Sequence, residues 1–224
     1  MPIQAFAPIL EAARTRHGVA ALEARLPKPK SAAELAATPD DRYLSDMCRR
    51  VFRAGLKHSL VDAKWPAFEE AFERFEPRRV RAMPDEKLES LLGDTRLIRH
   101  WGKLKSVRDN AAAMLEIVAE RQSFGAWLAA WPGDDIVGLW DTLAKRFSQM
   151  GGNSGPNFLR MVGKDTFILT PSVTGALKQW GIVKAPPKNR ADRAHVQAAF
   201  NQWAQETGRP LCQLSLILAG SVED

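Results

Sequence analysis

The chain is poor in cysteine and contains no long apolar run. Cys48 and Cys212 are the only cysteines among 224 residues, they lie far apart, and neither belongs to a CxxC motif or has a pair of histidines nearby. This disfavours a disulfide framework and a zinc site, and it favours two small buried apolar residues in a reducing compartment. No stretch of about 18 consecutive apolar residues is present, so we expect no membrane-spanning helix.

The N-terminal stretch MPIQAFAPILEAARTRHG has a short apolar patch, but Glu11 follows it and no small-residue cleavage site is evident. We therefore expect no secretory signal peptide, and the expected compartment is the cytoplasm. With 45% hydrophobic and 26% charged residues, the composition is that of an ordinary globular protein. The net charge of +6 favours association with polyanions, although such an excess is also common in proteins that do not bind nucleic acid.

Apolar residues recur at helical spacing along nearly the whole chain, and no segment shows the two-residue alternation of a strand. Proline and glycine mark most of the expected helix ends, and Ser31 and Glu34 stand at the spacing of a capping box. We therefore predict an all-α protein of about ten to twelve helices with short connections. The predicted helices include residues 8–26, 41–60, 65–75, 84–93, a long helix from about 102, 134–148, 155–162, a helix that begins at Pro171, 190–207 and about 211–219.

A turn rich in glycine precedes one of these helices, in the stretch MGGNSGPNFLRMVG. Gly151 and Gly152 allow positive φ angles and a close approach of another backbone, and Asn153 is the non-glycine residue best suited to a left-handed position. A helix start presents unpaired N–H groups and partial positive charge, so the turn from Gly151 to Ser154 is predicted to hold a phosphate. The alternative is a plain helix–helix turn without a ligand. A nucleotide P-loop is excluded because no GK[ST] follows.

Four short motifs lie upstream of this turn. They are Ala54-Gly55-Leu56, the aromatic step Phe72, Phe75 and Pro77, the run Ile98, Arg99 and Lys103, and the pair Asn110 and Ala111. With the helix, glycine turn, helix and Gly-x-Asp pattern that follows, the chain resembles the helix-hairpin-helix DNA glycosylases. Within that superfamily it is similar to the 3-methyladenine DNA glycosylase I family, over residues 44–183 or so.

The resemblance implies a single two-lobed domain over residues 1–224, with a cleft between the lobes and a hairpin at 149–163. It implies that the hairpin amides hold a phosphate of double-stranded DNA while a damaged nucleotide is flipped out, with no metal and no cofactor, and we expect a monomer. The implied DNA contacts are Gly151, Gly152, Asn153, Ser154, Arg99 and Lys103. The implied base pocket contains Arg50, Phe52 and His58, joined by Tyr43, which lies about two helical turns before Arg50 and so shares its face.

Each of these residues also has a structural interpretation. Tyr43 and Phe52 are typical core residues, Arg50 is typical of a solvated helix face, and His58 is suited to the negative end of a helix dipole. For Lys103 and Arg99, solvation or ion pairing is as good an explanation as a phosphate contact.

Several positions depart from the pattern of the family. Arg50 stands where the family has a glutamate, and His58 replaces the tryptophan that stacks on the base. Thr170 takes the place of an aspartate of the wider superfamily and is expected to act as an N-cap. Bifunctional members carry a lysine after the hairpin where this chain has Pro156 or Asn157, and the zinc ligands of the family have no counterpart. These departures favour a monofunctional hydrolase without a metal.

The predicted reaction is hydrolysis of the N-glycosidic bond of an alkylated, 3-methyladenine-like base or of another damaged base. Alkylated purines already carry positive charge and leave with little catalysis, but Arg50 repels a cationic base, so we expect a preference for a neutral lesion with exposed acceptors. The candidate catalytic acids are Asp46, Asp62 and Asp165. The alternatives are a catalytically inactive DNA-binding protein of the same fold, which recognises damaged or structured DNA, and an unrelated all-α protein with an ordinary glycine turn.

Overall fold

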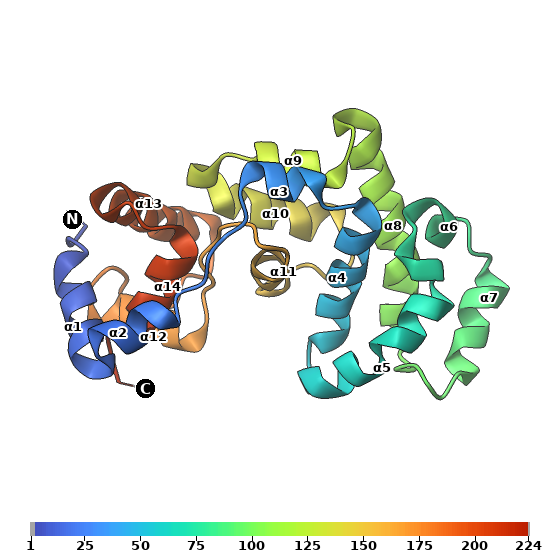
Figure 1. Ribbon diagram of the computed structural model, residues 1–224, viewed down its shortest axis with the longest axis horizontal. Helices are drawn as coiled ribbons and strands as arrows, with labels where there is room; N and C mark the ends of the chain where they lie inside the picture. The colour runs from blue at the N-terminus through green and yellow to red at the C-terminus, as the bar shows by residue number, and fades with distance from the viewer. Residues whose placement is uncertain (1–2, 224) are drawn as a thin grey trace. The chain divides into compact units, whose positions relative to one another are not determined.

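The computed structural model describes residues 3–223, and within that range it contains fourteen α-helices, three short 3-10 helices and no strand (Figure 1). The prediction of an all-α fold is confirmed. The helices exceed the expected number partly because two glycines with positive φ, Gly18 and Gly55, interrupt stretches that were predicted to be continuous. The chain divides into two compact units, one made of residues 3–29, 132–139 and 165–223 and the other of 30–131 and 140–164.

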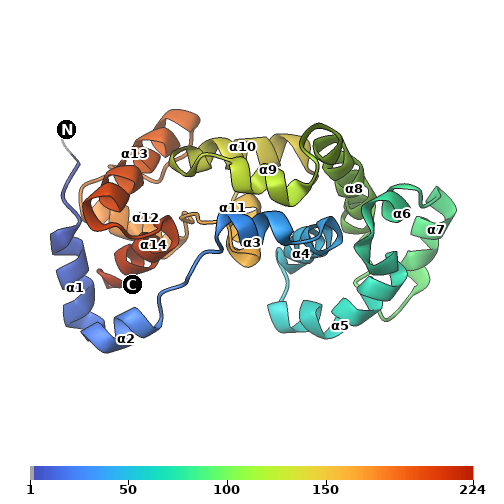
Figure 2. The ribbon, with the colours of Figure 1, turned by 45° about the horizontal axis from the view of Figure 1, so that its top comes forward.

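The larger unit contains the hairpin and all four upstream motifs. In this unit α3 lies along α9, α6 crosses α8, and α4 packs against both α8 and α11, as Figures 1 and 2 show. Its helices are α3 (Ala32–Ala37), α4 (Asp40–Arg53), α5 (His58–Ala71), α6 (Pro77–Arg81), α7 (Asp85–Ser90), α8 (Trp101–Arg121), α9 (Phe124–Ala130), the greater part of α10 (Ile136–Arg146) and α11 (Ser154–Val162), with the 3-10 helices η1 (Glu73–Phe75) and η2 (Leu91–Gly93).

A stack of aromatic rings holds α4, α5 and η1 together. Trp65 stacks on Phe75 with ring centroids 5.4 Å apart, and Phe52 packs against Phe68 at 4.5 Å. Such rings bury large apolar areas and dominate the energy of a core. The motif residues Phe72 and Phe75 are fully buried, so the aromatic step of the sequence is part of the core.

Three consecutive residues of η1 have left-handed backbone angles. The φ angles of Glu73, Arg74 and Phe75 are 51°, 56° and 59°. Each costs about 1 kcal/mol or more for a residue with a side chain. The turn is held by the aromatic stack around Phe75 and by Arg42, whose Nη2 donates to the carbonyl oxygen of Arg74 at 2.5 Å while its guanidinium forms two bonds of 3.0 Å to Glu69.

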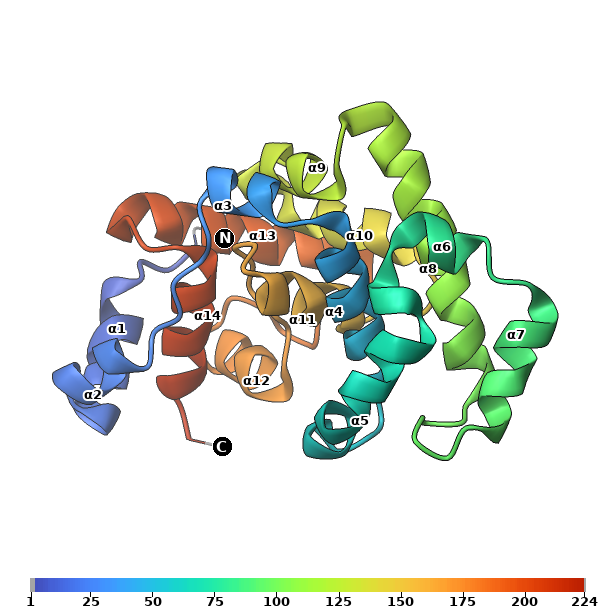
Figure 3. The ribbon, with the colours of Figure 1, turned by 45° about the vertical axis from the view of Figure 1, so that its right-hand side comes forward.

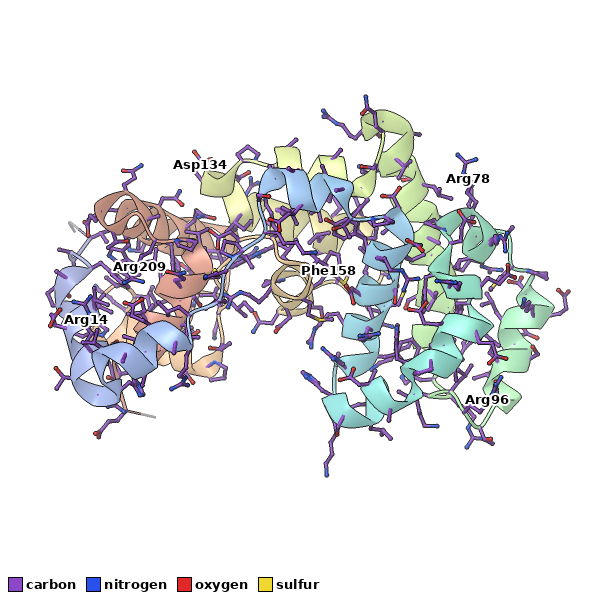
Figure 4. All side chains as sticks on the ribbon, in the orientation of Figure 1. Arg14, Arg78, Arg96, Asp134, Phe158 and Arg209 are labelled. Carbon is purple, nitrogen blue, oxygen red and sulfur yellow. The ribbon has the colours of Figure 1, made fainter. Side chains whose placement is uncertain are left out.

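Replacing Arg74 by glycine is expected to raise the free energy of unfolding by about 0.5–1 kcal/mol, because the exposed side chain is removed from a left-handed position and the carbonyl that Arg42 holds is kept. Denaturant unfolding measures the difference. Arg78→Gly is the control, since Arg78 projects from the ordinary helix α6 (Figure 4) and its loss should lower stability by about 1 kcal/mol. Equal losses in both variants would mean that the turn is not strained.

The smaller unit is built from α1 (Ala7–His17), α2 (Val19–Ala24), η3 (Gly133–Asp135), the start of α10, α12 (Pro171–Gln179), α13 (Arg190–Thr207) and α14 (Leu211–Gly220). Within it α1 runs beside α14 (Figure 3), and Phe167 stacks on Phe200 at 4.2 Å. Arg209, labelled in Figure 4, pairs with Glu23 at 2.6 Å. Both cysteines, one in each unit, are buried, as predicted. None of the helices in residues 3–223 is long and apolar enough to cross a membrane.

Candidate functional site

The glycine turn between α10 and α11 is closed by its own backbone. The amide of Gly155 donates to the carbonyl oxygen of Met150, and the amide of Ser154 donates to that of Gly151, both at 3.1 Å. Gly151 and Gly152 are exposed, and their amides donate no hydrogen bond to any other described residue. Gly152 has a φ of 58° with open space around the position of a Cβ atom. Two unpaired amides thus lie beside the start of α11, where the helix dipole adds partial positive charge.

Asn153 is not left-handed, which corrects the expectation from the sequence. Its φ is −82°, it is the N-cap of α11, and its carbonyl oxygen accepts from both the amide and the side chain of Asn157. The left-handed residues of the turn are instead Gly152 and Gln149, whose φ is 63°. Nothing in the local sequence singles out Gln149, because glutamine has no preference for this conformation.

Helix α8 holds the entrance to the turn. Asn110 is fully buried, its Nδ2 donates to the carbonyl oxygen of Ser148 at 3.2 Å, and its Oδ1 accepts from the amide of Ser148 at 2.7 Å. Gln149 adds a bond from its Nε2 to the carbonyl oxygen of Gly102 at 3.3 Å. Asn110, one of the motif residues, therefore positions the hairpin.

Lys103 caps the end of α4. Its side chain is 8% exposed, and its Nζ donates to the carbonyl oxygens of Ala54 at 2.6 Å and Phe52 at 3.3 Å. Burial, and then the charge of Arg50, lower the pKa of Lys103. The sequence proposed Lys103 as a DNA contact, but its ammonium is bound to the carbonyls that precede Gly55. Arg99, the other proposed basic contact, is exposed and forms no ion pair with the described residues.

Replacing Lys103 by methionine is expected to lower the free energy of unfolding by about 1–2 kcal/mol, because two carbonyls lose a charged donor while the repulsion from Arg50 is relieved. Urea unfolding measures the loss. The control is Lys105→Met, which changes an exposed lysine of the same helix and should stay within about 0.5 kcal/mol of the parent. If both variants are equally stable, Lys103 does not hold the end of α4.

The four proposed pocket residues differ in their exposure. Tyr43 and Phe52 are fully buried, and the Tyr43 hydroxyl donates to the carbonyl oxygen of Leu35 at 2.7 Å, so both serve the core in this conformation. Arg50 is half-buried with an Nε that has no hydrogen-bond partner among the described residues. Burial and the charge of Arg53 lower the pKa of Arg50.

His58 is exposed and lies at the start of a helix. The sequence placed it near the end of a helix spanning residues 41–60, beside the negative end of the dipole. The structure corrects this, because α4 ends at Arg53 and His58 is the first residue of α5, where the dipole is positive.

The three candidate acids have different partners. Asp62 forms a bidentate ion pair with Arg53, at 2.6 and 2.7 Å from its Nη2. Asp165 accepts from the amides of Leu211 and Cys212 at 2.8 and 2.9 Å, which caps the first turn of α14. Neither carboxylate is available without breaking these bonds.

Of the three candidate acids, Asp46 is the one whose carboxylate is not held by another described residue. It is partly buried on α4, one turn before Arg50, and it forms no hydrogen bond or ion pair with the described residues. Burial raises the pKa of Asp46, against the opposing effect of Arg49, Arg42, Lys30 and Arg53. A partly buried carboxylate without a partner is costly, and such groups are often functional.

Thr170 is the N-cap of α12, as predicted. Its side chain accepts from the amide of Val173 at 3.2 Å, and Pro171 occupies the first helical position. Elsewhere in residues 3–223, no group of three or more His, Cys, Asp and Glu side chains gathers as a metal site would require.

Solved DNA glycosylases share this fold. The 8-oxoguanine DNA glycosylase of Methanocaldococcus jannaschii superimposes with a TM-score of 0.57 at 13% identity, over 95% of this chain and 91% of that one. The 3-methyladenine DNA glycosylase I of Staphylococcus aureus gives a TM-score of 0.53 at 19% identity, over 68% of this chain and 92% of that one. At these identities the likeness concerns the fold alone, and it defines the class as the helix-hairpin-helix DNA glycosylase fold.

The family is narrower than the fold class. The family model described as methyladenine glycosylase matches residues 36–150, just over half of the sequence, and the chain belongs to this family. A stretch of 86 residues is 34% identical to DNA-3-methyladenine glycosylase 1 of Escherichia coli strain K12. That stretch is 38% of this chain and spans 46% of the E. coli protein, less than half of its length. The predicted family is confirmed.

Proposed function

We propose that the protein is a monofunctional DNA repair glycosylase, which hydrolyses the N-glycosidic bond of a damaged base flipped out of duplex DNA. The observation that carries this proposal is the exposed hairpin turn with unpaired amides at Gly151 and Gly152, in a chain of the methyladenine glycosylase family. Water is the nucleophile, and the protein acts as a monomer without metal or cofactor. We assign it to the cytoplasm, which agrees with a chain that has only two cysteines, both buried as thiols.

The binding step relies on the hairpin. Backbone amides that face solvent next to a helix start are suited to a phosphate oxygen, because they lose no internal bond when they bind it. The hydrogen bonds donated by the amides of Ser154 and Gly155 keep the shape of the turn, and Asn110 on α8 holds the turn in place. An anchored phosphate limits how the neighbouring nucleotide can leave the stack, and flipping then exposes the bond to be hydrolysed.

The chemical step relies on charge around α4. As the bond breaks, the sugar gains positive charge, and a carboxylate held in a poorly solvated place stabilises that charge. Asp46 is the carboxylate that fits this role, since Asp62 and Asp165 are bound elsewhere. Arg50 contributes a positive charge to the same helix, which favours a neutral base with acceptors such as N7 and O6 over a cationic base.

Base release from a panel of duplexes is the direct experiment. Duplexes that carry 3-methyladenine, a neutral oxidised purine such as 8-oxoguanine, or no lesion are incubated with the purified chain, and the released base is quantified. We expect release from a lesion-containing duplex, with the neutral lesion favoured. Tightest binding and fastest release with cationic 3-methyladenine would contradict the role given to Arg50, and no release from any lesion would contradict the glycosylase proposal.

Gly152→Ala is expected to weaken duplex binding about tenfold, because a side chain strains the left-handed backbone and occupies the space in front of the amides. Gly208→Ala is a matched control, since Gly208 also has a positive φ, of 67°, with open space around it, but it ends α13. Both variants should lose about 1 kcal/mol of stability. Fluorescence anisotropy at several salt concentrations compares them, and equal affinities would remove the hairpin from the binding surface.

Asp46→Asn is expected to lower the rate of base release about a hundredfold while duplex affinity changes little, since the charge acts on the reacting sugar. The parent rate should rise with pH through the pKa of Asp46, because the ionised form is active, and D46N should lack this rise. Burial raises that pKa, so the folded state favours the proton; D46N should therefore be more stable than the parent above this pKa, and the gain should vanish in acid.

The control for D46N is Asp62→Asn, which breaks the ion pair with Arg53 and should affect stability more than the rate of base release. Single-turnover assays measure the rate of base release, and thermal unfolding over a range of pH from acid to neutral measures stability, so the two effects can be separated. A D46N variant with the parent rate and pH profile would exclude Asp46 from the chemistry.

A catalytically inactive DNA-binding protein of the same fold is the second candidate. Two observations favour it: Arg50 stands at the position of the family glutamate, and two of the three candidate acids have structural roles. Salt-sensitive duplex binding without base release would support this function, because phosphate contacts release counterions whether or not chemistry follows.

A further inference from the structure

Trp101 leaves an aromatic side chain in solvent. It is 40% exposed, whereas the other large apolar residues with comparable exposure, Val19, Leu60 and Leu92, are aliphatic. Four of the other six tryptophans are buried, and the remaining two are partly buried. An indole is amphipathic and usually finds a partner, so its exposure on a rigid helix favours a role in binding.

Trp101 begins α8, the helix that holds the hairpin turn. The carbonyl oxygen of the next residue, Gly102, accepts from Gln149 in the turn, and Asn110 further along α8 clamps Ser148. The first turn of α8 therefore lies next to the exposed amides that are proposed to hold a phosphate. Trp101 and the hairpin turn both belong to the larger unit, and the hydrogen bonds of Gln149 and Asn110 fix the distance between them.

The surface around Trp101 carries positive charge without compensation. Residues 95–106 contain no aspartate or glutamate. Arg96 is paired with Asp94, and Lys103 is buried. Arg99 and Lys105 are exposed and form no ion pair with the described residues, and Lys105 lies four residues after Trp101 on the same helix face.

We propose that Trp101, Arg99 and Lys105 form a second DNA contact beside the hairpin, in which the indole stacks on bases uncovered when a nucleotide leaves the duplex. This inference rests on the proposed function, because only a flipped nucleotide leaves a gap in the stack. Aromatic side chains stack on bases whatever their identity, and cations on either side neutralise the phosphates. Trp101 is a positioning residue that holds the opened duplex.

The experiment compares affinity for an intact duplex and for the same duplex with a stable abasic-site analogue, which mimics the opened stack. Trp101→Ala should lose about tenfold in affinity for the abasic duplex and little for the intact one. Trp101→Phe should retain most of the preference, because a ring remains. Lys105→Ala should weaken both duplexes equally and lower the salt dependence, since it removes one phosphate contact. Leu92→Ala, which removes a similarly exposed apolar side chain from η2, is the matched control.

A spectroscopic readout tests the contact itself. Stacking on a base quenches indole fluorescence, so the abasic duplex should quench the parent more than W101F, which lacks this tryptophan. Parent-like abasic preference in W101A, or parent-like quenching in W101F, would overturn the inference while the proposed function stands. A parent that binds no duplex in a salt-sensitive manner would overturn both, whereas loss of abasic preference in W101A with thermal stability unchanged would support the inference even if no base is released.

Discussion

Two hydrogen bonds between the Asn110 side chain and the backbone of Ser148 decide where the hairpin turn lies. Asn110 is fully buried, so these bonds are shielded from water and leave its amide little freedom. Seven residues earlier on the same side of α8, Lys103 holds the last carbonyls of α4. One helix therefore sets the distance between the hairpin turn and the turn at Ala54-Gly55-Leu56. Motifs that are far apart in the sequence are therefore held at fixed positions relative to one another.

The fold and the hairpin could be predicted because both depend on patterns that act over a few residues. Apolar periodicity identifies the helices, glycines identify the turn, and Thr170 before Pro171 identifies a cap. The roles of Lys103 and Tyr43 could not be predicted in this way. The ammonium of Lys103 binds a carbonyl 49 residues away, and the Tyr43 hydroxyl binds that of Leu35, which belongs to another helix. A sequence pattern shows that a residue is polar, but it does not show which distant partner satisfies it.

The predictions that were wrong concern helix ends, where a small local difference in energy decides whether the chain adds another helical turn or reverses direction. Gly55 adopts a φ of 77° and separates α4 from α5, so the dipole acting on His58 has the opposite sign from the one expected. In the hairpin, Gly152 takes the left-handed position and Asn153 becomes an ordinary N-cap. Both choices depend on packing with other helices, because the local sequence permits either outcome.

The charges on α4 are the basis for the proposed preference for a neutral base. Arg53 is neutralised by Asp62, and Arg49 lies over the Trp65 ring at 5.0 Å, but Arg50 keeps a partly buried charge near Lys103. The charge of Arg50 contributes to the lowered pKa of Lys103, and like charges in a poorly solvated place repel one another. A cationic base would add another like charge, whereas a neutral base offers acceptors. The same positive charge attracts phosphate, so the charge that is proposed to disfavour a cationic base also favours binding to DNA.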